Sequence, residues 1–402
     1  ATTNPTLRIR SAELEHAFDR VAAGALTPSS PARSVSTSTG RRHVLHVLSE
    51  AYSIGGLSRL VQRWIQRDGA SQSSVVVTRQ DHLVAVLGEV AEASGGRGYA
   101  LGEESDPISR AQALRGLAEE ADYVFCHLNP EDHVVAMAFG EGYSGAPIAL
   151  FNHSDHMFLL SPTKASLIVD FRSVGSEFTA AARGYPVEST YRLPLLIPDC
   201  EQTTEQRYET RDALGISSDQ VVALTLARGV KFKDTPLRPR FSDLVGRALE
   251  EHPNLVVCAV GASGDEEPWS RLETRFPGRV HTVGPVPDPQ PYIGAADLYL
   301  DTFPFSSLTS MLEASAAALP VLTFDGHERL RRVLGIADFT ATEADRPADL
   351  ESYFARIAEL VEDPTVRRER GRRARETVLA LAPGGLWLER LGGLYQAVDQ
   401  AT

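Results

Sequence analysis

The stretch AADLYLDTFPFSSLTSMLEASAAALPVLTF, residues 295–324, decides our interpretation of the fold. It opens with an apolar run over residues 298–300, which is followed by a loop rich in hydroxyl groups. Good helix formers occupy residues 311–319, and Pro320 separates them from a second apolar run over residues 321–324. This order predicts a strand, a loop, a helix and a strand, which is the repeating unit of a parallel sheet in α/β proteins.

The loop before the predicted helix suits an anionic group. Ser307, Leu308, Thr309 and Ser310 lead into the helix, whose first backbone N–H groups have no partner within it. Such N–H groups and the positive end of the helix dipole attract an anion such as a diphosphate. Glu313, near the start of the helix, is placed to reach a ribose. The alternative is an ordinary strand–helix unit capped by serines.

The segment DTFPFSSLTSMLEA, residues 301–314, resembles the nucleotide-sugar site of the GT-B glycosyltransferases, especially the O-linked N-acetylglucosamine transferases and their bacterial relatives. The resemblance implies an α/β fold of two Rossmann-like domains facing each other across a cleft. It implies that residues 307–310 contact the donor diphosphate and that Glu313 binds the ribose. Two features differ from the family: Ser307 and Leu308 replace its loop glycine, and Phe305 stands where retaining members carry a first glutamate. The second difference favours an inverting reaction.

The resemblance extends to other donor-site residues. Arg228 and Lys233 follow an apolar strand over residues 221–227, like the basic pair that clamps the diphosphate in many GT-B enzymes. Fixed cations there stabilise the charge of the leaving diphosphate, although a solvated basic turn is the alternative. The loop at Val286 would hold the nucleobase through backbone contacts, and His327 and Arg329 would face the donor.

A first, N-terminal domain is predicted to carry the acceptor. A strand from His43 is followed by Gly55 and Gly56 and then by an amphipathic helix. A glycine pair lets a ligand approach a helix N-terminus, but it is not the three-glycine dinucleotide fingerprint. Similar turns face the cleft in GT-B enzymes.

A polar cluster follows the predicted strand over residues 147–151. It contains His153, Asp155 and His156 and lies at the carboxyl edge, where open α/β sheets keep their sites. A histidine suits removal of a proton from an acceptor hydroxyl, amine or thiol, so we expect His153 to be the base and Asp155 to orient a histidine. His127 is a lesser candidate on the same edge. The spacing of His153 and His156 also suits a pair of metal ligands, but no third ligand is evident. We therefore expect neither a catalytic metal nor a cofactor besides the nucleotide-sugar co-substrate.

Composition narrows the class of protein. A chain of 402 residues suits two domains, and a net charge of −13 argues against nucleic acid or an anionic membrane as the main partner. Of the three cysteines, Cys126 and Cys258 lie in apolar strands and Cys200 lies apart, so we expect buried free thiols and a cytoplasmic location. We expect no transmembrane segment.

The predicted organisation starts with an extension in which an amphipathic helix over residues 8–23 carries Leu14, Phe18 and Val21 roughly on one face. Trp387 and Leu391 would anchor the last helix on the first domain. The predicted divisions are 1–40 (helix and linker), 41–197 (acceptor domain), 198–210 (linker), 211–382 (donor domain) and 383–402 (C-terminal helix). Further predictions are strands over 74–78 and 122–127, a strand and turn over 169–176, and helices over 177–182, 242–251, 349–361 and 365–381.

These patterns predict a glycosyltransferase that uses a UDP- or GDP-sugar and a small-molecule, glycan or peptide acceptor. Two alternatives stay open: a sugar-nucleotide epimerase, which needs no acceptor, and a non-catalytic subunit that binds nucleotide and supports a partner enzyme. The sequence selects neither the nucleobase, the sugar, the acceptor nor the oligomeric state.

Overall fold

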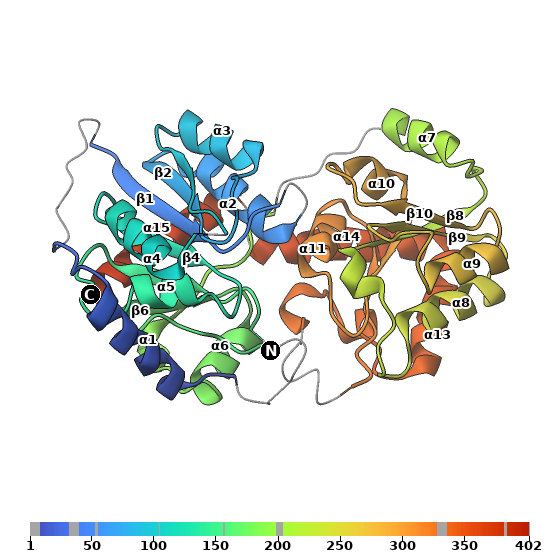
Figure 1. The fold of residues 1–402 in the computed structure, drawn as a ribbon. Helices are drawn as coiled ribbons and strands as arrows, with labels where there is room; N and C mark the ends of the chain where they lie inside the picture. The colour runs from blue at the N-terminus through green and yellow to red at the C-terminus, as the bar shows by residue number, and fades with distance from the viewer. Residues whose placement is uncertain are drawn as a thin grey trace. The chain divides into compact units, whose positions relative to one another are not determined.

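The computed structural model describes residues 9–31, 40–52, 55–103, 105–155, 157–197, 204–327, 336–381 and 384–401. The chain forms two compact units (Figure 1): unit 1 comprises residues 1–196 and 385–402, and unit 2 comprises residues 197–384. No helix among the described residues is long and apolar enough to cross a membrane. Cys126 and Cys258 are buried free thiols, as predicted.

Unit 1 is built on a seven-stranded parallel sheet in the order β3-β2-β1-β4-β5-β6-β7. Because the strand order reverses between β1 and β4, the carboxyl ends of these two strands mark a topological switch point. The strands are β1 (Arg42–Leu48), β2 (Ser71–Val77), β3 (Gly98–Ala100), β4 (Tyr123–His127), β5 (Ile148–Phe151), β6 (Ala165–Asp170) and β7 (Thr190–Arg192).

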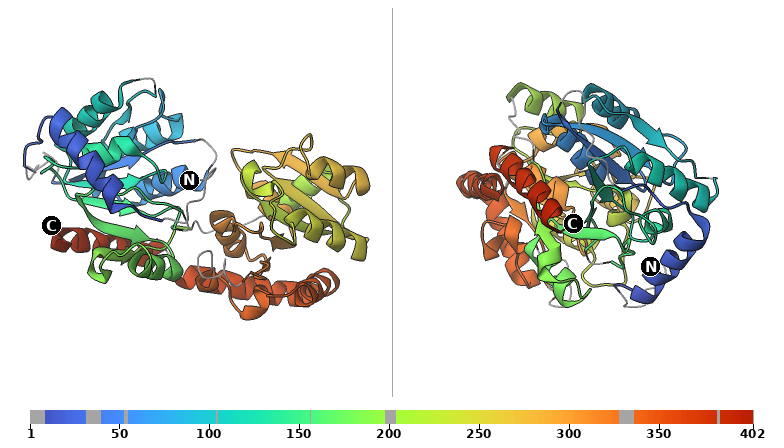
Figure 2. Two further views of the ribbon diagram at one scale, coloured as in Figure 1. Left: turned by 60° about the horizontal axis from the view of Figure 1, so that its bottom comes forward. Right: turned by 90° about the vertical axis from the view of Figure 1, so that its left-hand side faces the viewer.

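Helices cover both faces of this sheet. Alternate residues of β1 enter different cores: Leu45 packs with residues of α4 and α5, whereas Val44 packs with Trp64 of α2 and with Trp387 and Leu391 of α15. The last helix of the chain therefore belongs to unit 1 (Figure 2). The helices are α1 (Ala12–Ala25), α2 (Gly56–Arg67), α3 (Ala85–Ala93), α4 (Pro107–Ala118), α5 (His133–Ala138), α6 (Ser173–Ala181), the 3-10 turn η1 (Val187–Ser189) and α15 (Gly384–Ala401).

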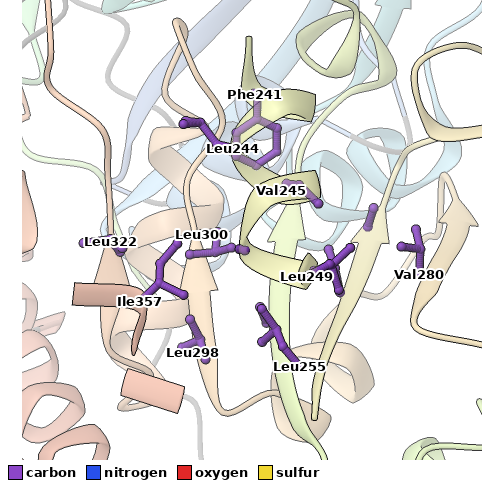
Figure 3. Close-up of a cluster of buried hydrophobic side chains, with 14 of the residues drawn as sticks. Phe241, Leu244, Val245, Leu249, Leu255, Val280, Leu298, Leu300, Leu322 and Ile357 are labelled. Atoms are coloured by element: carbon purple, nitrogen blue, oxygen red, sulfur yellow. The ribbon is translucent and has the colours of Figure 1, made fainter. Parts of the chain in front are cut away.

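Unit 2 contains a five-stranded parallel sheet in the order β10-β9-β8-β11-β12, so its switch point lies between β8 and β11. Figure 3 shows the apolar core on one face, where Leu298 and Leu300 of β11 pack near Leu255 of β9 and near helices α8 and α13. The elements are α7 (Thr204–Ala213), β8 (Val221–Leu226), η2 (Gly229–Phe232), α8 (Phe241–Glu251), β9 (Leu255–Val260), α9 (Trp269–Arg275), β10 (Val280–Gly284), α10 (Gln290–Ala295), β11 (Leu298–Leu300), α11 (Leu308–Ala316), β12 (Val321–Leu322), η3 (Ala337–Phe339), η4 (Glu343–Asp345), α13 (Leu350–Glu362) and α14 (Pro364–Leu381).

The predicted linker over residues 198–210 is wrong from Thr204 onward, because helix α7 begins there. This polar helix docks on unit 2 through charge: the guanidinium groups of Arg207 and Arg211 each lie 2.5 Å from a carboxylate oxygen of Asp297. The same arginines donate to backbone oxygens of residues 294–296, and hydrophobic periodicity does not reveal such polar contacts.

The apolar face predicted for the first helix is confirmed only at Phe18, which packs against the core of unit 1. Leu14 and Val21 of α1 are 40% and 42% exposed, whereas Glu15 and Ala22 are buried. Glu15 accepts hydrogen bonds from the guanidinium of Arg10, with the closest contact at 2.9 Å, and this pairing offsets the cost of burying its charge.

The segment predicted as a strand and turn over 169–176 is divided differently. Strand β6 ends at Asp170, and helix α6 already begins at Ser173. Gly175 in its first turn accommodates two carboxylates, because an added Cβ would lie 2.8 Å from Asp155 and 3.3 Å from Asp170. Close polar neighbours, not strand packing, therefore shape this segment.

Candidate functional site

The loop after β11 is shaped by a buried carboxylate. Asp301 is 1% exposed, and its Oδ1 accepts hydrogen bonds from the backbone N–H groups of Thr302 (3.0 Å) and Ser307 (2.9 Å). Burial raises the pKa of Asp301, and hydrogen bonds from Ser306 and from these N–H groups oppose the rise. The carboxylate thus closes residues 301–307 into a fixed loop at the carboxyl edge of the sheet.

Helix α11 begins at Leu308, three residues before the predicted start. Leu308, Thr309 and Ser310 therefore form its first turn, and all three are partly exposed. The N-cap Ser307 makes no side-chain hydrogen bond to the helix, and the first turn contains no acidic residue. This amino end retains the features that favour an anion: backbone N–H groups and the positive end of the helix dipole.

A lysine that we did not predict holds this loop. Lys231 in η2 donates from Nζ to the backbone oxygen of Ser306 (2.5 Å). Phe232 is buried beside Trp269, with ring centroids 5.2 Å apart, and this anchors the turn between the two lysines. Lys233 instead lies 3.3 Å from Glu266, and both side chains are about 60% exposed.

Lys231 is thus the basic residue that contacts this loop, whereas Lys233 forms an exposed ion pair. The role of Lys233 at the donor diphosphate remains a prediction. Arg228 is exposed and immediately precedes η2, at the carboxyl end of β8. The spacing of basic residues in the sequence does not distinguish the two lysines. The structure does distinguish them: Phe232, which lies between the two lysines, is buried, and so their side chains point in different directions.

Glu313 lies one turn into α11 and is 1% exposed. It approaches Tyr299 of β11: burial, then Asp301 and Glu313, raise the pKa of the Tyr299 hydroxyl. Its ribose role remains a prediction. Val286 lies in the loop that follows β10, where Gly284 adopts a φ of +66° and turns the chain. Its role at the nucleobase likewise remains a prediction.

His327 packs over the loop that Asp301 organises. Its ring stacks on Phe303, with centroids 5.6 Å apart and planes 14° from parallel, and its Nε2 is hydrogen-bonded to the backbone oxygen of Arg238 (2.7 Å). This contact uses one of its two ring nitrogens. Arg329 and His156, which we also predicted as site residues, lie outside the described residues.

The glycine pair of unit 1 begins helix α2, with Gly55 as the N-cap and Gly56 as the first residue. A Cβ added to Gly55 would meet no atom within 4 Å, so packing does not require glycine there. The same switch point has a buried carboxylate that we did not predict. Asp132 accepts hydrogen bonds from the hydroxyl groups of Ser49 and Thr78, both at 2.6 Å, and joins the carboxyl ends of β1 and β2.

His153 follows β5 and is hydrogen-bonded to another imidazole. Its Nε2 lies 3.1 Å from Nδ1 of His127, and Nε2 of His127 lies 3.3 Å from Nδ1 of His46. Burial lowers the pKa of His46 and of His153 to about 3. Burial, then His153 and His46, also lower the pKa of His127 well below its usual range. All three imidazoles are neutral near pH 7.

Asp155 takes part in a buried ion pair. Its two carboxylate oxygens accept from the guanidinium of Arg172 at 2.5 and 2.8 Å. Arg183 donates to the backbone oxygens of Asp155 (2.8 Å) and Met157 (2.7 Å). The structure gives His127 as a hydrogen-bond partner of His153 and Arg172 as a partner of Asp155, and the predicted role of Asp155 in orienting a histidine remains a prediction. Among the described residues no group of three or more His, Cys, Asp and Glu side chains is placed to hold a metal ion.

No protein-family model matches the chain, and no curated protein matches it by sequence. Solved structures do match. Anabaena HepE, in complex with UDP and glucose, is 14% identical, with 89% of this chain and 100% of that chain covered and a TM-score of 0.66. Staphylococcus aureus TarM, in a complex that includes UDP, is 10% identical, with 88% and 99% covered and a TM-score of 0.64.

The Thermobaculum terrenum O-GlcNAc transferase is 16% identical, with 96% of this chain and 75% of that chain covered and a TM-score of 0.59. Together with the two parallel sheets and their strand orders, these similarities confirm the predicted fold class. The chain has the fold of the GT-B glycosyltransferases.

Proposed function

We propose that the protein is a glycosyltransferase that moves a sugar from a nucleotide-sugar donor to an acceptor. The observation that carries this proposal is the fixed loop over residues 301–307, which leads into the amino end of α11 and is bonded by Lys231. A cation beside a helix amino end suits a diphosphate. Anabaena HepE is a structural neighbour in complex with UDP-glucose, so a UDP-sugar is the first donor to test and a GDP-sugar the second.

In this proposal the first turn of α11 binds the diphosphate through backbone N–H groups at Leu308, Thr309 and Ser310. Arg228 adds positive charge from the end of β8, where the leaving diphosphate gains negative charge. Glu313 binds the ribose, and the backbone at Val286 holds the nucleobase. His327 and Arg329 face the donor from the segment after β12.

The reaction we propose breaks the bond between the anomeric carbon and the diphosphate oxygen, and the electron pair leaves with the nucleoside diphosphate. The acceptor heteroatom forms the new bond to the opposite face of the sugar, and its proton passes to His153. Support for this base is its position directly after β5, at the carboxyl edge of the sheet, with Nε2 in contact with His127. If Nε2 carries the proton of this contact, Nδ1 is the nitrogen that takes the acceptor's proton. Inversion at the anomeric carbon and reaction without a metal are part of this proposal.

A thermal-shift panel of UDP, GDP, CDP and ADP tests donor binding. A ligand that binds only the folded protein at about 100 times its Kd adds about 2.7 kcal/mol to the free energy of unfolding. We expect a clear rise in melting temperature with UDP or GDP and a smaller rise with the others. If none of the four shifts the melting temperature at millimolar concentration, the proposal fails.

Two further outcomes separate the alternative functions. Incubation with donor alone, followed by analysis of the sugar nucleotide, yields an isomerised sugar only if the protein is an epimerase. Tight binding of a nucleoside diphosphate, with no transfer to any acceptor class and no donor hydrolysis, would identify a non-catalytic subunit. A glycosyltransferase transfers the sugar only when an acceptor is present, apart from slow hydrolysis.

A further inference from the structure

Phe305 is an aromatic residue that the loop over residues 301–307 exposes. Its exposed fraction is 39%, whereas Phe303, two residues earlier, is only 7% exposed and packs against Phe324, with ring centroids 5.2 Å apart. The loop thus buries one of its phenylalanines and presents the other. A single exposed apolar side chain is common on protein surfaces, so its meaning depends on where the ring is held.

Hydrogen bonds hold the backbone that carries this ring. The backbone oxygen of Phe305 accepts from Oγ1 of Thr302 (2.7 Å), and the next backbone oxygen, that of Ser306, accepts from Nζ of Lys231 (2.5 Å). The hydroxyl groups of Thr302 and Ser307 are themselves 3.0 Å apart. The Cα atom of Phe305 therefore has a fixed position, and a ring on a fixed backbone loses little conformational entropy when it contacts a ligand.

The ring lies close along the chain to the proposed diphosphate site. Phe305 precedes Leu308, the first residue of α11, by three residues, so their Cα atoms are at most about 11 Å apart. A phenyl ring has no charge and no hydrogen-bond donor or acceptor, so it does not itself bind a phosphate group. Its contact with the donor is therefore an apolar contact with a group attached to the diphosphate.

The strand order places Phe305 at the sugar end of the donor rather than at the base end. Strand β10, which precedes Val286, is separated from β11 by β9 and β8, so the ends of β10 and β11 lie about 14 Å apart. With the base at Val286 and the diphosphate at α11, the nucleotide crosses the carboxyl ends of β9 and β8. Phe305 follows β11 and so belongs to the diphosphate end of this span, to which the sugar is attached.

An aromatic ring selects among sugars by the group that faces it. A hexose in its ring form has patches of carbon-bound hydrogens beside its hydroxyl groups, and an N-acetyl or deoxy sugar adds a methyl group. The face of an aromatic ring carries partial negative charge and attracts such C–H groups. A hydroxyl group held against the ring would lose its hydrogen bonds to water without gaining another.

We propose that Phe305 is a specificity-determining residue for the donor sugar: its ring contacts carbon-bound hydrogens or a methyl group of the sugar and disfavours a hydroxyl group at that place. This role rests on the proposed function and narrows it to donors whose sugar presents such an apolar group next to the diphosphate. Stacking of the ring on the nucleobase is the competing contact. The two contacts differ in whether binding of the nucleotide without its sugar depends on the ring.

Calorimetry with Phe305→Ala tests this contact. The ligands are UDP, UDP-glucose and UDP-N-acetylglucosamine, or GDP and GDP-mannose if the thermal-shift panel selects GDP. We expect the substitution to raise the Kd of at least one sugar nucleotide about fivefold, and that of the nucleoside diphosphate less than about twofold. A change below about twofold for every sugar nucleotide, or an equal change for the nucleoside diphosphate, would overturn the proposal.

Tyr208→Ala is the matched control, because Tyr208 is also an exposed aromatic residue of unit 2. It lies on α7, and the neighbouring Arg207 and Arg211 donate to backbone oxygens of residues 294–296, which precede β11. Tyr208 therefore lies toward the amino edge of the sheet, opposite to Phe305. We expect Tyr208→Ala to leave every Kd unchanged and both variants to keep the wild-type melting curve. Equal effects of the two substitutions on the sugar nucleotides would also overturn the proposal.

A second measurement detects the contact directly. In protein that is deuterated except at its phenylalanine rings, nuclear Overhauser effects to a bound ligand come from those rings. We expect such effects at protons of the sugar in the sugar nucleotide that binds most tightly. We also expect their loss in Phe305→Leu, which keeps an apolar side chain without the ring. Absence of these effects in the wild-type protein, or their persistence in Phe305→Leu, would contradict the role of the ring.

These outcomes are distinct from those of the proposed function. If neither UDP nor GDP binds, the glycosyltransferase proposal fails and the role of Phe305 falls with it. If a nucleoside diphosphate binds and sugar transfer occurs, but Phe305→Ala leaves the Kd of every sugar nucleotide unchanged, the proposed function stands and the role of Phe305 is refuted.

Discussion

Mild acid should weaken unit 1 through the buried histidines. His46 and His127 are completely buried, and burial lowers the pKa of both imidazoles. In the unfolded chain each would take up a proton near its ordinary pKa of 6.5. The stabilisation that neutral burial provides is therefore complete above this pKa and is lost as the pH falls below it, because only the unfolded state binds the protons.

The magnitude follows from this difference in proton binding. Between about pH 7 and about pH 5.5, each fully buried imidazole lowers the free energy of unfolding by about 1.2 kcal/mol. Asp170 acts in the opposite direction, because burial raises its pKa to about 6 and the folded state takes up a proton in this range. That uptake raises the free energy of unfolding by about 0.8 kcal/mol. The net loss from these three groups is about 1.6 kcal/mol, and the partly exposed His153 adds less than one full imidazole.

Tryptophan fluorescence can report this loss for unit 1 alone. Trp64 and Trp387 are buried in unit 1 and Trp269 in unit 2, so a Trp269→Phe background leaves only the probes of unit 1. Urea unfolding at the two pH values gives the free energies. His46→Gln should remove about 1.2 kcal/mol of the difference, while His82→Gln, at an exposed position, should not. A pH effect below about 0.5 kcal/mol in the wild-type protein would refute the reasoning.

Three further predictions concern the donor site and the base. Lys231→Ala should weaken UDP binding at least about tenfold in calorimetry. Lys233→Ala should change UDP binding less than about twofold, because an exposed ion pair contributes little. Equal effects of the two substitutions would contradict the placement of Lys231 at the diphosphate. Asp301→Ala leaves two buried N–H groups without their acceptor, so it should lower the free energy of unfolding of unit 2 by about 2 kcal/mol or more and weaken UDP binding; a wild-type unfolding curve would contradict the role of its carboxylate. His153→Ala should reduce turnover far more than donor affinity, and near-normal turnover at saturating acceptor would exclude this base. Glu313→Ala should reduce donor affinity far more than turnover.

Most strands of both sheets were predictable because they contain continuous apolar runs, which is typical of parallel strands buried on both faces. The short strands β3 and β7 are not such runs and were not predicted. The predicted strand over 221–227 and the short run over 298–300 agree with β8 and β11. Segments held by charge were not predictable in this way. Helix α7 and the buried face of α1 depend on ion pairs at Asp297 and Glu15, which a count of apolar residues does not detect.

The candidate site likewise combines features that are local in the sequence with contacts between residues far apart in the chain. Hydroxyl groups before a helix indicated the proposed anion-binding loop at residues 307–310, because this feature is local in the sequence. The role of Lys231 depends on a contact with Ser306, 75 residues further along the chain. The contact between His46 and His127 spans 81 residues. Such contacts are set by the strand order of the sheet, which the sequence does not state, and so the contacts of Lys231 and His46 were missed.

The most direct test of the central claim is a crystal structure of the protein with UDP. We predict that the diphosphate lies at the amino end of α11, within hydrogen-bond distance of backbone N–H groups of residues 308–310 and close to Lys231. A diphosphate bound elsewhere, or no nucleotide in this site at a UDP concentration that saturates binding in solution, would contradict it.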